Sequence, residues 1–169
     1  MVGVIRRFPK GASVAAALAV GALTLGPAVA LGTEGAHFKS ASASVANNGA
    51  LVVSWDEAGV GNATVDYSMT AQGTATYGCI NGGGNHPKAS NKETVNGPVA
   101  ANGSFPATKN GRVTGSLSAG PPSAGSFSCP SGQTFALISV SYSGITLTDT
   151  TNNVTANIGS VSRTFLNVK

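Results

Sequence analysis

The chain has 169 residues, of which 41% are hydrophobic, only 9% are charged and 23 are glycine. Its formal net charge is +4, but three of the 10 basic residues lie at its very start, so the rest of the chain is almost neutral. This composition excludes a chain kept unfolded by its charge. It also leaves no clustered basic surface for nucleic acid or for an anionic membrane. We expect at most one folded domain.

The first residues, 1–30, have the pattern of a secretory signal peptide. Basic residues precede an apolar stretch at residues 12–25, and the small-residue triplet Ala28-Val29-Ala30 follows. The apolar stretch is short for a membrane span of about 20 residues, and glycine interrupts it, so a permanent anchor is disfavoured. We predict cleavage after Ala30 by the general secretory route rather than the twin-arginine route. The product is then a secreted, extracellular protein of residues 31–169, and the Ala-rich, Gly-rich signal is typical of bacteria.

Strand patterns dominate the chain after residue 38. Val, Thr, Ser and Tyr alternate in runs that end at Gly, Asn or Pro, and no segment keeps a helical apolar period for three turns. The runs predict strands at residues 38–46, 50–57, 63–79, 93–101, 111–118, 134–142, 145–149, 154–158 and 161–168. We expect a break at Gly73 and turns at Asn47-Asn48-Gly49, Asn102-Gly103 and Asn110-Gly111, because these residues tolerate positive φ.

About eight strands at this spacing are typical of two packed sheets. We therefore predict an all-β fold, a two-sheet antiparallel β-sandwich, with a small β-barrel as the alternative. Trp55 precedes both cysteines, and Phe127 stands where an immunoglobulin domain has its corner tyrosine, so the pattern does not match that family. We expect Trp55 and the three tyrosines to pack in the core, although exposed aromatics would suit a sugar-binding surface.

The two cysteines, Cys79 and Cys129, predict one disulfide. An even cysteine count in an exported chain is typical of structural bridges. Redox catalysis and zinc binding are disfavoured because the chain has no Cys-x-x-Cys pair and no histidine at zinc-ligand spacing. We expect the bridge to tie the Gly-rich segment before Asn91 and the Pro-rich segment before Cys129 to one end of the sandwich.

No residue pattern in the chain predicts catalysis. His37 and His86 are the available neutral-pH bases, and neither accompanies a Gly-x-Ser-x-Gly nucleophile motif. Asp56 and Glu57 are neighbours on a predicted strand, so they point to opposite faces and cannot form a facing acid and base. Asp56 with Asp66 remains a possible carboxylate pair if their strands are neighbours.

Calcium ligation is the remaining inorganic possibility. Asp149 with the two asparagines that follow it suits either calcium ligation or an Asx-type turn. The chain has no Asp-x-Asp-x-Asp-Gly loop, and we expect no cofactor and no metal.

Three classes of function remain open. The first, which we favour, is an exported non-catalytic binding or adaptor protein with a protein partner, one subunit of an extracellular assembly. Its candidate contact residues are Leu31, His37, Phe38 and Lys39, in the extended N-terminal segment 31–39, which could add a strand to a partner. The second is a carbohydrate- or cell-wall-binding module with polysaccharide as ligand. The third is a small secreted enzyme or an enzyme inhibitor; for an inhibitor, the candidate loops are those around Pro87 and Pro121-Pro122.

Overall fold

Eight β-strands form the folded part of the protein. The computed structural model describes residues 35–81 and 91–166, and no α-helix occurs in these residues. The predicted signal peptide, residues 1–30, lies outside the described residues. In chain order the strands are β1 (His37–Val45), β2 (Leu51–Ala58), β3 (Thr64–Asn81), β4 (Lys92–Pro106), β5 (Arg112–Ala119), β6 (Gln133–Asp149), β7 (Val154–Ile158) and β8 (Val161–Thr164).

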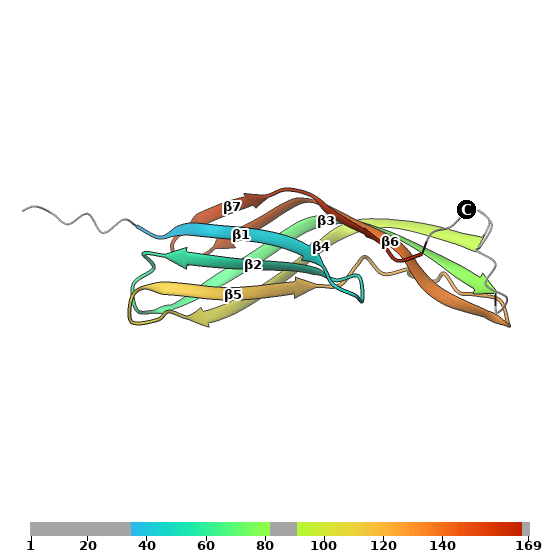
Figure 1. The fold of residues 1–169 in the computed structure, drawn as a ribbon, viewed down its shortest axis with the longest axis horizontal. Helices are drawn as coiled ribbons and strands as arrows, with labels where there is room; N and C mark the ends of the chain where they lie inside the picture. Colours follow the sequence, from blue (N-terminus) through green and yellow to red (C-terminus); the bar gives the residue numbers. More distant parts are fainter. Residues whose placement is uncertain (1–34, 82–90, 167–169) are drawn as a thin grey trace, which may run out of the picture. The chain divides into compact units, whose positions relative to one another are not determined.

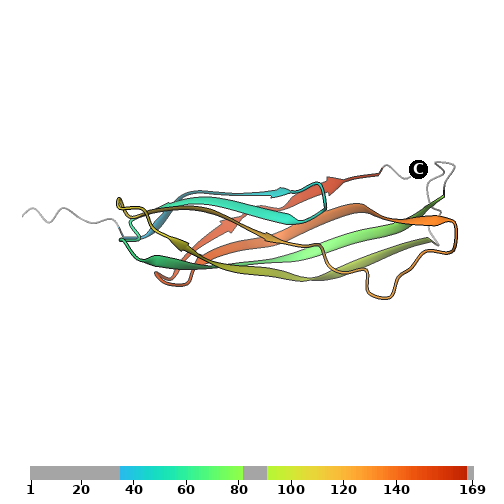
Figure 2. The ribbon, with the colours of Figure 1, turned by 90° about the horizontal axis from the view of Figure 1, so that it is seen from below.

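The strands make two sheets. Sheet A has three strands in the order β1-β2-β5, and sheet B has five, in the order β4-β3-β6-β7 with β8 also pairing with β6. All pairings are antiparallel, and Figures 1 and 2 show the sheets as two layers. The predicted β-sandwich is confirmed, and the barrel alternative is wrong because the two sheets do not close into one.

The core lies between the two sheets and follows from alternation along the strands. On β2, Leu51, Val53 and Trp55 are buried, whereas Ser54 between them is exposed. Successive side chains on a strand point to opposite faces, so one apolar residue in two supplies a complete inner face. Full burial of such a side chain contributes about 1.5–3 kcal/mol.

The four aromatic residues expected in the core are all buried, as predicted. The exposed fractions are 4% for Trp55, 2% for Tyr67, 7% for Tyr77 and 1% for Tyr142. The Trp55 and Tyr67 rings lie 4.6 Å apart, and Phe105 packs edge-on against Trp55 at 4.9 Å. These contacts join sheet A to sheet B through one aromatic cluster.

β6 is one strand where two were predicted. Gly144 has a φ of 58°, and the pairing of β6 with β3 shifts between Thr70 and Gln72. The extra residue on β6 is a β-bulge, which changes the phase of alternation without ending the strand. As a result both Tyr142 and Ile145 point into the core, each with 1% exposure.

Two other predicted interruptions are also wrong. β3 continues through Gly73, where a Cβ would lie 2.8 Å from the ring of Pro122. β4 continues through the expected turn at residues 102–103, where Gly103 lies opposite Tyr67. In both places glycine gives room to a neighbouring side chain instead of allowing a positive φ. The predicted turns that contain Gly49 and Gly111 are confirmed, with φ values of 87° and 65°.

Sheet B is much longer than sheet A. Its strands β3, β4 and β6 have 18, 15 and 17 residues, whereas β1, β2 and β5 have 9, 8 and 8. In Figure 1 sheet B continues to the right, beyond the turn that joins β1 to β2. Sheet A therefore covers only part of the inner face of sheet B, and another segment must cover the rest.

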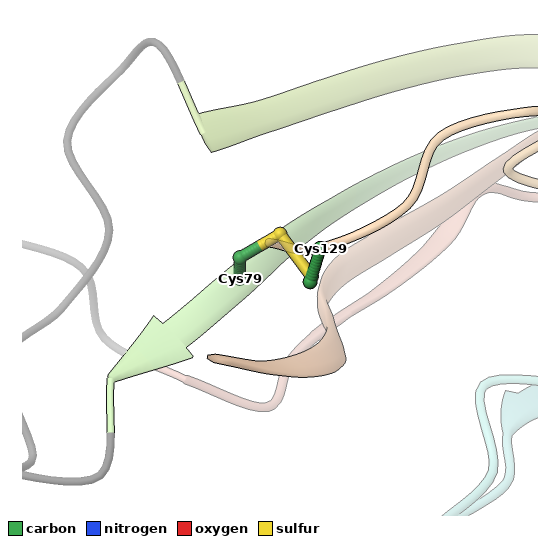
Figure 3. Close-up of a disulfide and its surroundings, with 2 residues drawn as sticks. All are labelled: Cys79 and Cys129. Carbon is green, nitrogen blue, oxygen red and sulfur yellow. A yellow bond between two sulfur atoms is a disulfide. The ribbon is translucent and has the colours of Figure 1, made fainter. Parts of the chain in front are cut away.

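Residues 120–132, which connect β5 to β6, supply part of that cover. The Tyr77 hydroxyl donates a hydrogen bond of 2.6 Å to the carbonyl oxygen of Pro122, and burial raises the pKa of Tyr77. The segment is also joined covalently to β3 by the disulfide between Cys79 and Cys129, as predicted (Figure 3). The bridge thus holds an irregular segment against a sheet that would otherwise expose its inner face.

Candidate functional site

An apolar groove lies where sheet A ends and sheet B continues. Its volume is about 380 Å³. The residues that line it come from four separate parts of the chain: Asn47, Asn48, Ile80, Ala136, Leu137, Phe165 and Leu166. None of these side chains is ionisable, so the groove fits an uncharged ligand better than a charged one. We call this feature the groove.

The β1–β2 turn forms one wall of the groove and is firmly held. Gly49 donates its backbone N–H to the carbonyl oxygen of Ala46 at 3.0 Å. The hydroxyl of Tyr142 in sheet B donates a hydrogen bond of 2.7 Å to the carbonyl oxygen of Gly49, and burial raises the pKa of Tyr142 to about 12. A Cβ at Gly49 would lie 2.3 Å from the Leu137 side chain, so the turn packs directly on the floor of the groove.

The free edge of β6 forms the opposite side of the groove. β7 pairs with β6 at Ile145–Asp149, and β8 pairs with it at Ser139–Tyr142. Phe165 and Leu166 then both donate backbone N–H groups to the carbonyl oxygen of Ile138. Of the residues that the structure describes, none pairs with β6 on this side from Gln133 to Leu137. Gln133 donates its backbone N–H to Pro130, so among the described residues the part of β6 left as a sheet edge on this side is residues 134–137.

Phe135 lies on this same unpaired stretch. It is 46% exposed and is the one large hydrophobic side chain so exposed among the described residues. Its ring stacks on Tyr77 at 5.2 Å and contacts Phe127 at 6.1 Å. Phe135 directly precedes the groove residues Ala136 and Leu137 on β6.

The N-terminal residues that the sequence singled out lie elsewhere. Leu31 is outside the described residues. His37 is the first residue of β1, one residue before the predicted start of the strand at residue 38, and its Nδ1 lies 2.9 Å from the carbonyl oxygen of Gly35. Phe38 pairs with Glu57 in the ladder, and Lys39 falls at the register shift that follows. Residues 37–39 are therefore already part of the protein's own sheet, and whether they also contact a partner remains a prediction.

The acidic residues do not form the carboxylate pair considered from the sequence. Asp56 lies on sheet A and accepts hydrogen bonds from Arg112, which hold its pKa below the usual range. Asp66 lies on sheet B and accepts a hydrogen bond from Ser104. The pairing of Asp56 with Asp66 is wrong because β2 and β3 belong to different sheets. Glu57 does point away from Asp56, as predicted, and is fully buried.

Asp149 forms the turn that was one of its two predicted roles. Its Oδ1 accepts the backbone N–H groups of Thr151 and Asn152, each at 2.8 Å. This is an Asx-type turn. Within residues 35–81 and 91–166, no group of three or more His, Cys, Asp or Glu side chains could hold a metal ion. His86 lies outside the described residues.

Candidate residues for two alternative functions have structural roles, and Pro87 lies outside the described residues. Trp55 and the three tyrosines are core residues, so they do not form an exposed aromatic row for sugar binding. Pro122 is buried against β3 and is not part of a protruding inhibitory loop. In the described part of the chain, no helix is long and apolar enough to cross a membrane.

The sequence did not reveal the groove because its residues are far apart in the chain. A signal existed at Phe135 and Leu137, two apolar residues in the opposite phase to the buried Ile138, Val140 and Tyr142. The pairing of β6 with β3 shifts a second time, between Thr76 and Tyr77. Because of this shift, both sets of apolar residues on β6 can contact other parts of the protein.

Comparison of the chain with protein-family models, with curated proteins and with solved structures finds no match.

Proposed function

We propose that this protein is an exported, non-catalytic binding or adaptor protein, one subunit of an extracellular protein assembly. The observation that supports this function best is the apolar groove beside the unpaired stretch of β6. A groove with free backbone hydrogen-bonding groups along one side suits an extended segment of another protein. The backbone of that segment would pair with β6, and alternate side chains would enter the groove.

The chemistry of the groove defines the kind of segment expected. The groove has uncharged walls, and its floor includes Leu137 and Ile80. A partner segment should therefore carry apolar side chains at every second position, without charges at those positions. Because residues on one face of a strand recur with a period of two, a single-residue shift of the partner would expose its apolar side chains.

Secretion is part of the proposal. The disulfide between Cys79 and Cys129 is compatible with an oxidising, extracellular setting. The signal-like residues 1–30 provide the route. A secreted protein with a free strand edge next to an apolar groove is equipped for assembly with other exported chains.

A site-specific crosslinking experiment tests this function. The protein is produced from the full-length chain in a secreting host with a photoreactive phenylalanine analogue in place of Phe135. It is then illuminated in the culture fluid of its native cells. We expect one crosslinked protein partner, with the link mapped by mass spectrometry to an extended apolar segment.

Two matched alanine variants locate the contact. Ala136→Glu places a charge in the groove, whereas Ala100→Glu places the same charge at an exposed position on β4 of the same sheet. The crosslink should disappear in the first variant and persist in the second. Loss in both, loss in neither, or retention of the protein on cell-wall polysaccharide without a protein crosslink would overturn the proposal.

A further inference from the structure

Two carboxyl groups are buried between the sheets, away from the groove. Glu57 lies on β2 in sheet A, and Asp149 lies at the end of β6 in sheet B; both have 0% exposure. Tyr67 on β3 lies opposite Asp149 in the ladder and donates a hydrogen bond of 2.7 Å to Oε2 of Glu57. The three side chains therefore form a polar contact that joins the two sheets inside an otherwise apolar core.

The two carboxyl groups accept different numbers of hydrogen bonds. Asp149 accepts three hydrogen bonds, from the backbone N–H groups of Thr151 and Asn152 and from the Asn152 side chain. Glu57 accepts the one from Tyr67, and its Oε1 has no donor among the described residues. A buried carboxylate oxygen without a donor is costly. A proton on Glu57 would remove that cost.

Asp149 is the residue that would accept a hydrogen bond from a protonated Glu57. Both carboxyl groups belong to residues that neighbour Tyr67, and Asp149 raises the pKa of Glu57, because two adjacent buried carboxylates cannot both ionise without a large repulsion. A hydrogen bond between two carboxyl groups requires that one of them carries the proton. Asp149 already has three donors, so the proton belongs on Glu57.

The other groups around Glu57 do not replace this proton. Tyr67 already donates to Glu57, and burial raises the pKa of its hydroxyl, so it stays protonated. His37 on β1 acts on Glu57 through its charge, with a smaller effect than burial and Asp149. On β5, Val113 is the ladder partner of Glu57, and Arg112 beside it is bound to Asp56 on the other face.

We propose that Glu57 donates a proton to Asp149, and that this shared proton is a pH-sensitive lock between the two sheets. When Glu57 loses the proton, two negative charges face each other in the core. The repulsion weakens the contact between β2 and the end of β6. The carboxylate of Asp149 also holds the Asx turn that follows it. The same repulsion should therefore weaken this turn.

The direction of the effect follows from burial, which raises the pKa of Glu57 from 4.5 to about 7. Because the folded state binds the proton more tightly than the unfolded state, the stability that this proton contributes is complete below pH 4.5 and is lost as the pH rises through 7. The full effect of a shift of this size is an increase of roughly 300-fold in the unfolding equilibrium constant, from pH values well below 4.5 to pH values well above 7. The lock is therefore closed in an acidic exterior and weakened in a neutral to alkaline one.

Two measurements test the lock on protein produced from the full-length chain. Carboxyl ¹³C chemical shifts of the wild-type protein give the titration midpoint of Glu57 directly, and we expect it near 7. Denaturant unfolding between pH 4.5 and 8 gives the stability profile. Glu57→Gln, which donates a hydrogen bond at every pH, should flatten that profile, whereas Asp66→Asn, at an exposed carboxylate, should leave it unchanged.

Each outcome decides the proposal. A midpoint near 7 with a flattened profile in E57Q supports the lock. A midpoint near 4.5, or an E57Q profile as steep as that of the wild type, overturns it. If E57Q does not fold, the wild-type titration midpoint alone decides.

Discussion

Removal of the disulfide should have the largest effect on stability of the changes discussed here. The double substitution Cys79→Ala and Cys129→Ala opens a loop whose ends are 50 residues apart in sequence. In the chain-entropy relation, a closure of this length stabilises the folded protein by about 4 kcal/mol, because it restricts the unfolded chain. For a domain of this size that loss corresponds to a fall in Tm of about 15 °C.

The position of the bridge explains why the effect should exceed that of a peripheral crosslink. Cys79 is 2% exposed on the inner face of β3, and its partner lies in the segment that covers this face. Without the bridge, the Tyr77 hydrogen bond to Pro122 becomes the main polar contact that holds the segment. We therefore expect residues 120–132 to exchange amide hydrogens faster than the rest of the protein.

Denaturant unfolding, followed by tryptophan fluorescence of Trp55, measures the stability loss. The wild-type protein is compared with and without reductant, and the double variant serves as the control because reductant should not affect it. A loss below about 1 kcal/mol, or faster exchange spread evenly over both sheets, would refute the reasoning. In that case the segment would be held by its own packing and not by the bridge.

Three further changes test the packing and the surface charges. Tyr142→Phe leaves the buried carbonyl of the β1–β2 turn without its donor, and we expect a loss of about 1–2 kcal/mol by denaturant unfolding. Gly73→Ala places a methyl group 2.8 Å from Pro122 and should cost about 1–3 kcal/mol. Gly97→Ala is its matched control at ordinary contact distance, and equal losses would contradict the packing. Asp56→Asn should reduce the stability lost on acidification below pH 3.8, because the ion pair with Arg112 lowers the pKa of Asp56. Thermal unfolding measured as a function of pH gives this loss, and an unchanged loss in the variant would contradict the prediction.

The strand content and the buried face could be predicted from the sequence because they depend on local alternation. In β2, every second residue from Leu51 to Glu57 is buried, and the same holds for Val65 to Met69 in β3. A period of two on a strand needs no information about neighbouring strands. The burial of Glu57 follows from that period as well, since it occupies the next inward position after Trp55.

Glycine was the residue type whose role the sequence predicted only in part. Gly49 and Gly111 form turns, Gly144 forms a bulge, and Gly73 and Gly103 leave space for neighbouring side chains. A local pattern does not distinguish these roles, because the last two depend on residues that are far away in the chain. The sequence therefore predicted false breaks at Gly73 and Gly103 and divided β6 into two strands.

The sequence alone determined the all-β class, the inner faces of the strands, the disulfide partners and the core position of Trp55, because each depends on spacing within one segment or on a count of two cysteines. Only the tertiary structure decided which strands are neighbours. It separated Asp56 from Asp66, brought Glu57 to Asp149, and assembled the groove from four distant segments. The physical reason is that pairing between strands far apart in sequence depends on how whole faces pack, and no single segment carries that information.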